Sequence, residues 1–243
     1  MRGSNPALNP GAFTSVAGTA TAGMTVQGTI NKTGILILLT MASATWTWSL
    51  AGRDPAAAGP LVLLGLLGGL VFALATVFAK RWAPVTAPLY ALLEGLVLGG
   101  ISALYNAASH GIAIQAVGLT FGTLVVMLAA YSTGLIRVTQ RFRTVVVAAT
   151  GAIALFYLVS LVLGFFNVQV PLLYSSGPVG ILFSVAVVIV AAFNLALDFN
   201  FIQAGAAAGA PRFMEWYGAF GVMVTLIWLY LEILRLLSKL RSR

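Results

Sequence analysis

The amino-acid sequence predicts an all-α integral membrane protein, a compact bundle of seven transmembrane helices. Two features of the composition support this prediction: 60% of the 243 residues are hydrophobic and only 7% are charged, an apolar share well above that of soluble domains. The third is the arrangement of the apolar residues in runs of about 20, the length that crosses a bilayer as a helix.

Seven apolar segments are long enough to span the bilayer. They are residues 33–51, 60–79, 88–108, 112–133, 144–166, 178–200 and 216–237. Pro, Gly and charged residues mark the breaks between them, as in AGRDPAAAGP, KRWAPVTAP and IRVTQRFR. We therefore expect a mobile polar tail over 1–32, one transmembrane domain over 33–237 and a basic tail over 238–243, with no room for a soluble domain.

The basic residues predict how the bundle is oriented. The chain has 13 Lys and Arg against 5 Asp and Glu, a formal charge of +8, and most of the basic residues fall in alternate loops. By the positive-inside rule these loops and the N-terminus are cytoplasmic. Seven crossings would then place the basic end RLLSKLRSR outside, so the last helix either crosses despite its charge or is re-entrant. Basic residues spread over separate loops do not favour nucleic-acid binding.

The counts of cysteine and histidine argue against several classes of functional site. Without cysteine there is no thiolate metal site or cysteine nucleophile, and His110 is the only histidine, which argues against a histidine metal cluster. We expect no enzymatic activity and no bound cofactor. Small residues four apart, which allow close helix approach in lipid, recur along the spans, as in Gly65 and Gly69, Gly95 and Gly99, and Gly118 and Gly122.

Acidic residues inside the spans are the main candidates for a functional site. Glu94 in the third span, Asp198 at the end of the sixth and Glu215 at the start of the seventh lie at a similar depth. Carboxylates clustered in a low dielectric repel one another, so we expect one of them to hold a proton near neutral pH, or the group to bind a cation. Asn194, one helical turn before Asp198, is placed to donate a hydrogen bond to it.

Each acid also has a purely structural interpretation. Glu94 would tie helices together, and Asp198 would lie in the headgroup region. Glu215 would complement the helix dipole. Glu232, near the opposite end of the seventh span, would form an ion pair with Arg235 three residues later. Asp54, in a loop beside a proline, is expected to be a turn residue.

Taken together, these features resemble the Bax inhibitor-1 family, also called the transmembrane Bax inhibitor motif family, and in particular its bacterial branch. The resemblance rests on seven spans, basic loops after the second and fourth, LDFNFI near the end of the sixth and ILRLL in the last. It implies a central last helix and a location in the bacterial plasma membrane. It also implies a pH-sensitive calcium leak, in which aspartates of the sixth and seventh helices share a proton.

Asp198 matches the first aspartate of that pair, and it is also the candidate calcium ligand. Aligning LYLE of the last span with the family's Leu-Tyr-Leu-Asp makes Glu232 the second, whereas aligning ILRLL, without a gap, places Thr225 there. With Thr225, Glu94 or Glu215 would have to replace the missing acid. The basic residue that the family pairs with this site would be Lys80 or Arg81.

Two functions remain open from the sequence. One is a pH-sensitive calcium or cation leak channel with an intramembrane carboxylate as proton sensor. The other is a non-conducting scaffold that regulates other membrane proteins. The expected partners are the lipid bilayer, calcium ions, protons and, for the scaffold, other membrane proteins.

Overall fold

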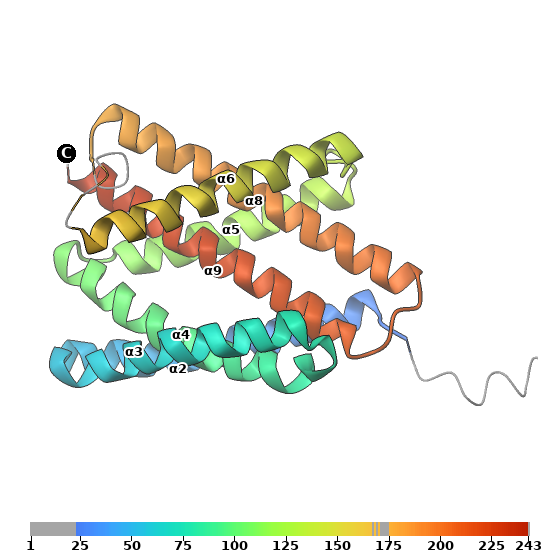
Figure 1. The fold of residues 1–243 in the computed structure, drawn as a ribbon, viewed down its shortest axis with the longest axis horizontal. Coiled ribbons are helices and arrows are strands. Elements are labelled where there is room, and N and C mark those ends of the chain that lie inside the picture. The colour runs from blue at the N-terminus through green and yellow to red at the C-terminus, as the bar shows by residue number, and fades with distance from the viewer. Residues whose placement is uncertain (1–22, 167, 169, 171–174, 243) are drawn as a thin grey trace, which may run out of the picture.

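A computed structural model describes residues 23–166, 168, 170 and 175–242 of the chain. These residues form seven long α-helices and one short 3-10 helix, with no strand among them (Figure 1). The elements are α2 (Val26–Arg53), α3 (Pro55–Phe78), η2 (Lys80–Trp82), α4 (Ala83–Ala108), α5 (Ile112–Ser132), α6 (Gln140–Phe165), α8 (Pro178–Ala207) and α9 (Met214–Arg241). All seven α-helices are long and apolar enough to cross a membrane, which confirms the predicted bundle.

Several helices start earlier or end later than the apolar runs suggest. The α2 helix begins at Val26, within the predicted tail, because the Thr25 hydroxyl caps it by accepting a 2.9 Å hydrogen bond from the backbone N–H of Gly28. Residues 1–22 of that tail lie outside the described residues. The carboxylate of Asp54 likewise caps α3 by accepting from the backbone N–H groups of Ala56 and Ala57, so the predicted turn residue is an N-cap.

The sixth span is also longer than predicted. Helix α8 continues to Ala207, so Asp198 lies nine residues before its last residue rather than at its end. The reason is that FIQAGAA, though less apolar, contains no helix-breaking proline. Asp198 is therefore well inside a membrane-spanning helix. Helix α9 is unbroken from Met214 to Arg241, 28 residues, which gives it a length of about 42 Å.

The helices form two groups with α9 between them. Figure 1 shows α2, α3 and α4 on one side and α5, α6 and α8 on the other. Helix α9 packs against α2, α4, α5 and α8, whereas α6 packs mainly against α8. Helix α9 consequently supplies more residues of the hydrophobic core than any other helix, among them Leu229 and Leu234, which are fully buried.

Glycines allow α4 to pack closely against its neighbours. A Cβ atom added to Gly95 or Gly99 would overlap the α2 backbone at Thr40 or Ala44. By contrast, Gly118 and Gly122 of α5 have nothing within 4 Å of the position that a Cβ would take. The small-residue spacing therefore predicts close packing on α4 but marks an open surface on α5.

Candidate ion and proton site

Asp198 is half-buried where α8 faces α9. The Thr225 hydroxyl on α9 donates a 2.6 Å hydrogen bond to its Oδ2 atom. Gly221, one turn earlier on α9, leaves space beside the carboxylate, since a Cβ there would lie 3.6 Å from Oδ1. The structure thus brings Asp198 to Thr225, the position identified by aligning ILRLL. In the described part of the chain, no Lys or Arg forms an ion pair with Asp198.

The amide side chains near Asp198 form hydrogen bonds with residues of other helices. Asn194 donates a 2.8 Å hydrogen bond to the Thr150 hydroxyl of α6 and a 2.9 Å bond to the Val190 carbonyl. The expected bond from Asn194 to Asp198 is therefore wrong, because α6 packs on this part of α8 and supplies a hydroxyl acceptor. Farther along α8, Gln203 accepts a 2.9 Å hydrogen bond from Tyr131 of α5. These amides hold α8 to its neighbours.

Glu94 lies on α4, half-buried beside α3. A Cβ added to Gly69 of α3 would lie 3.0 Å from its Oε2 atom, so the glycine makes room for the carboxylate. Glu94 has neither a hydrogen bond nor an ion pair to another described side chain. It makes no hydrogen bond to Asp198, which is bonded by Thr225, and among the described residues no three His, Cys, Asp or Glu side chains are grouped so that they could hold a metal ion. The predicted three-carboxylate cluster does not form in this part of the chain.

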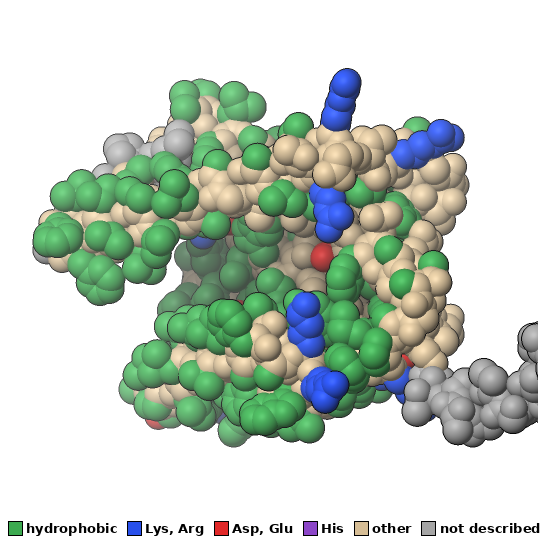
Figure 2. All heavy atoms as spheres, turned by 45° about the vertical axis from the view of Figure 1, so that its right-hand side comes forward, with side chains coloured by type: hydrophobic (Ala, Val, Ile, Leu, Met, Phe, Trp, Pro, Cys, Tyr) green, Lys and Arg blue, Asp and Glu red, His purple; other side chains and the backbone are tan. Residues whose placement is uncertain are grey.

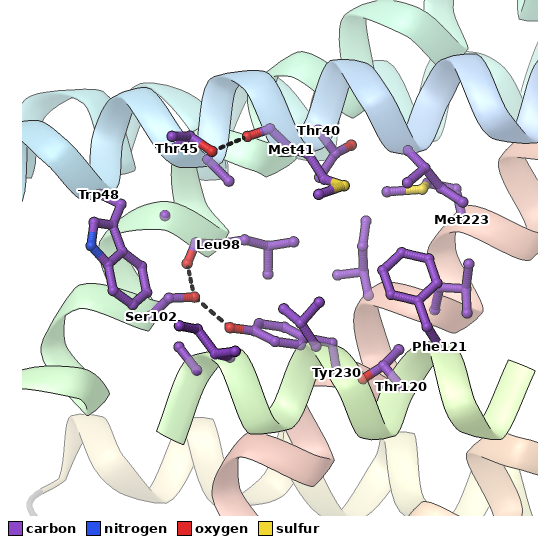
Figure 3. A pocket seen from close by; sticks show the side chains of 18 residues that line it. Thr40, Met41, Thr45, Trp48, Leu98, Ser102, Thr120, Phe121, Met223 and Tyr230 are labelled. Carbon is purple, nitrogen blue, oxygen red and sulfur yellow. Dashed lines mark hydrogen bonds between the residues drawn. The ribbon is translucent and has the colours of Figure 1, made fainter. Parts of the chain in front are cut away.

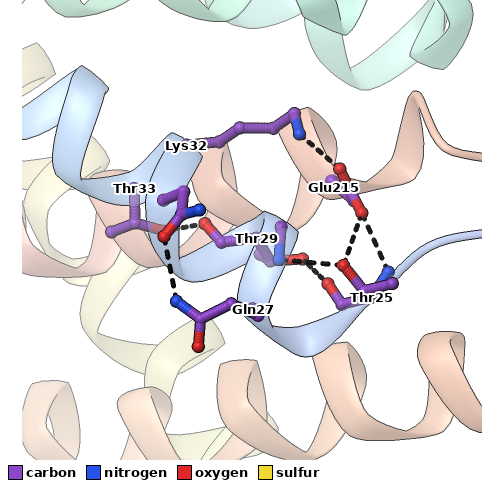
Figure 4. A network of polar contacts seen from close by, with 8 residues as sticks. Thr25, Gln27, Thr29, Lys32, Thr33 and Glu215 are labelled. Carbon is purple, nitrogen blue, oxygen red and sulfur yellow. Dashed lines mark hydrogen bonds and ion pairs between the residues drawn. The ribbon is translucent and has the colours of Figure 1, made fainter.

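Glu215 is held by the first turns of α2 instead (Figure 4). Its Oε1 atom accepts 2.9 Å hydrogen bonds from both the backbone N–H and the hydroxyl of Thr25. Its Oε2 atom forms an ion pair with Lys32, whose ammonium also lies 5.6 Å from the centre of the Trp216 ring. Glu215 is only 2% exposed, so beyond its favourable place at a helix N-terminus it is half of a buried ion pair that joins α2 to α9.

Glu232 has a comparable arrangement near the other end of α9. It is 1% exposed, and Arg235 donates to both of its oxygens at 2.8 and 2.9 Å. Tyr157 of α6 donates a 2.6 Å hydrogen bond to the same carboxylate. The expected Glu232–Arg235 pair is present, but its carboxylate is buried and is also bonded by α6. Glu232 lies seven residues beyond Thr225 on α9, about 10 Å farther along the axis, and it makes no hydrogen bond to Asp198.

The basic residues after α3 remain apart from the acids. Lys80 and Arg81 are exposed in η2, and the Lys80 ammonium lies 5.3 Å from the centre of the Tyr217 ring. Neither forms an ion pair with an acid in the described residues, so the predicted pairing with Asp198 is not made here. Figure 2 shows Lys and Arg side chains around a hollow between the two helix groups, with an acidic side chain visible inside. These positively charged side chains therefore lie at the entrance of the hollow.

Comparison with known proteins identifies the family of this chain. The profile of a family described as Bax inhibitor 1 like matches residues 5–242, nearly the whole chain. The chain belongs to the Bax inhibitor 1-like family. No curated protein and no solved structure matches it significantly. In this Bax inhibitor 1-like protein a threonine, Thr225, faces the intramembrane aspartate.

Two contacts of the site region have no clear signal in the sequence. The partner of Glu215 is Lys32, 183 residues away, and that of Glu232 includes Tyr157, 75 residues away. The only available signal is chemical, because an acid inside a span requires a partner. That requirement identifies the acids but does not say which basic or hydroxyl side chain supplies the contact.

Proposed function

We propose that this protein is a pH-sensitive cation leak channel in which Asp198 is the proton-binding carboxylate and calcium is a transported ion. One observation carries the proposal: Asp198 lies inside a spanning helix and is contacted by a neutral hydroxyl, that of Thr225. The acids on α9 are already neutralised by Lys32 and Arg235. A membrane-embedded carboxylate without a basic partner is a place where a proton or a cation binds.

The proposed pH response follows from the hydrogen bond between α8 and α9. When Asp198 is ionised it can only accept, and the Thr225 hydroxyl donates to it. When it is protonated it also carries a donor and loses its attraction for cations. Protons and calcium would therefore compete for the same oxygens, and the α8–α9 contact would change with protonation. The resemblance to calcium leak proteins, described above, supports this choice of ion.

The non-conducting scaffold is the second candidate, and a specific observation favours it. Thr225 stands where the family resemblance expects a second acid, and no metal-binding group of three acids or histidines forms within the described residues. Calcium usually takes six to eight oxygen ligands, so Asp198 and Thr225 would need water or backbone oxygens to complete a site.

Calcium flux into dye-loaded liposomes that hold the purified protein tests both candidates, measured between about pH 6 and 8 where a carboxylate in a low dielectric can titrate. Asp198→Asn should abolish the flux or remove its pH dependence. Thr225→Val removes the hydroxyl donor and should shift the pH at which flux changes. Thr150→Val is the matched control, because it removes a hydroxyl that contacts α8 through Asn194 and not through Asp198.

The outcomes separate the candidates. Flux that depends on pH in the wild type and in Thr150→Val, but not in Asp198→Asn, would support the channel with Asp198 as sensor. Flux with unchanged pH dependence in Asp198→Asn would move the sensor elsewhere, first to Glu94. No flux at any pH from correctly folded protein would refute the channel and favour the scaffold.

A further inference from the structure

A second feature of the membrane domain is an apolar cavity of about 540 Å³ enclosed by α2, α4, α5 and α9. Figure 3 shows Thr40, Met41, Thr45 and Trp48 of α2 on one side, with Thr120 and Phe121 of α5 opposite them. Helices α2 and α5 each pack on α4 and α9, which form the base of the cavity. Neither Asp198 nor Glu94 lines it, so it is separate from the candidate ion site.

The cavity opens onto the surface that faces lipid. Of the residues at its edge, Met41 is 49% exposed and Ile114 is 75% exposed. These apolar side chains continue the lipid-facing surfaces of α2 and α5, on which other large apolar residues such as Leu38 and Val125 are also exposed. A chain from the surrounding bilayer can therefore enter sideways without crossing a polar barrier.

The hydroxyl groups in the lining are already bonded within the protein. Each of five has a partner: Thr40 donates to the Ala91 carbonyl, Thr45 to that of Met41, Thr120 to that of Ala116, Ser102 to that of Leu98, and Tyr230 is bonded to Ser102. Because these hydroxyls already donate their hydrogen bonds to oxygens of the protein, the cavity has few free donors for a polar ligand or a hydrated ion. Its chemistry instead fits a hydrocarbon chain.

The length of the cavity matches one leaflet of a bilayer. Its α2 wall runs from Ile37 to Trp48. Trp48 follows Ile37 by eleven positions, or about 16 Å along the helix, and half of a bilayer's hydrocarbon core is about 15 Å. Trp48 lies at one end of the cavity and Met223 and Phe121 lie at the other (Figure 3). The Trp48 indole N–H makes no hydrogen bond to a described residue. Trp48 is five residues from the end of α2, and near the end of a spanning helix lipid headgroups supply acceptors for such an N–H.

We propose that this cavity binds one acyl chain of a membrane phospholipid, with the ester carbonyl near the Trp48 indole and the chain end near Met223 and Phe121. The bound chain fills the space between α2 and α5 and contacts α9 at Leu226 and Ile227, immediately after Thr225. The proposal does not depend on channel activity.

Trp48 is a built-in probe of this site. In a variant that keeps only Trp48, with the other four tryptophans changed to phenylalanine, fluorescence in detergent is titrated with a phosphatidylcholine brominated on its acyl chain, since bromine quenches tryptophan on contact. The matched control keeps only Trp46, which is 57% exposed on α2 and does not line the cavity. We expect quenching of Trp48 to saturate at a low ratio of lipid to protein, and that of Trp46 to rise in proportion to the lipid in the micelle.

A substitution that fills the cavity provides a second test of the proposal. Val117→Phe places a ring into the cavity from α5, whereas Leu119→Phe adds the same ring at an exposed position of α5 outside the lining. Displacing about two methylene groups of the chain should weaken binding at Trp48 about tenfold in Val117→Phe and leave it unchanged in Leu119→Phe. If the single-tryptophan variants fail to fold, native mass spectrometry of proteins with all five tryptophans measures retained phospholipid, which Val117→Phe alone should lose.

Equal, unsaturated quenching of Trp48 and Trp46 would overturn the proposal, because it would mean ordinary contact with bulk lipid. Saturable quenching that Val117→Phe does not weaken would also overturn it, since the lipid would then bind elsewhere. Absence of any quenching of Trp48 would overturn the proposal as well, because it would mean that no acyl chain occupies the cavity beside the indole.

Discussion

The ion pair between Lys32 and Glu215 should be a major contributor to the stability of the bundle. It joins the first and last described helices, and the Lys32 and Glu215 side chains are only 15% and 3% exposed. Replacing Lys32 by methionine leaves the carboxylate without its cation, although Thr25 still donates to it. Replacing Glu215 by glutamine leaves a buried ammonium and keeps an oxygen acceptor for Thr25.

The expected cost comes from the charge that each single change leaves behind. Removing one partner of a buried pair typically costs about 3–5 kcal/mol, whereas removing both is often nearly neutral. Because Lys32 lies near the start of α2 and keeps some exposure, we expect the lower end, about 3 kcal/mol, for each single variant. The double variant Lys32→Met with Glu215→Gln should lose at least about 2 kcal/mol less than the sum of the singles.

Equilibrium unfolding in mixed detergent micelles measures these free energies, with fluorescence of the neighbouring Trp216 as the signal. Lys80→Met is the matched control, because Lys80 contacts the Tyr217 ring but is exposed and has no acidic partner in the described chain; it should change stability by less than about 0.5 kcal/mol. A coupling energy below about 0.5 kcal/mol would refute the structural role of the pair.

Two further predictions concern contacts between helices. Tyr157→Phe removes the hydrogen bond that Tyr157 donates to Glu232 and the one that it accepts from Arg235, but leaves the ion pair between Glu232 and Arg235. The same unfolding measurement should show a loss of about 1 kcal/mol, and no loss would contradict these bonds. Gly99→Leu should prevent folding, because its side chain would overlap the α2 backbone, whereas Gly118→Leu should fold normally in open space; equal yields of folded protein in size-exclusion chromatography would show the assigned packing surfaces to be wrong.

The sequence predicts the fold well because the bilayer restricts the choices. A run of about 20 apolar residues has to form a helix, since its backbone groups find no other partners in lipid. Its ends are less predictable, because they depend on local caps rather than on hydropathy. Thr25 starts α2 inside a polar segment and Asp54 starts α3 next to a proline, and neither residue contributes to an apolar run.

The candidate site is only partly predictable for a different reason. Placing an acid inside a membrane costs free energy, so acids within the spans are expected to have a function. This argument identifies Asp198, Glu94, Glu215 and Glu232 from the sequence alone. Depth along the helices suggests that three of them meet, but depth does not determine the direction in which a side chain points. Glu215 turns to α2, where Lys32 compensates its charge, and charge compensation by a residue 183 positions away is a property of the tertiary structure.

The distribution of charge partners indicates where a proton-linked change can occur. Glu215 and Glu232 each have a basic partner and a hydroxyl donor, so protonating either would break an ion pair and leave a partly buried cation without its acid, at a cost that opposes such a change. Protonating Asp198 breaks no ion pair in the described chain, and the Thr225 hydroxyl can exchange the role of donor for that of acceptor. The contact between α8 and α9 can therefore persist in both protonation states, which supports the proposal that Asp198, rather than either of the ion-paired acids on α9, is the proton-binding group.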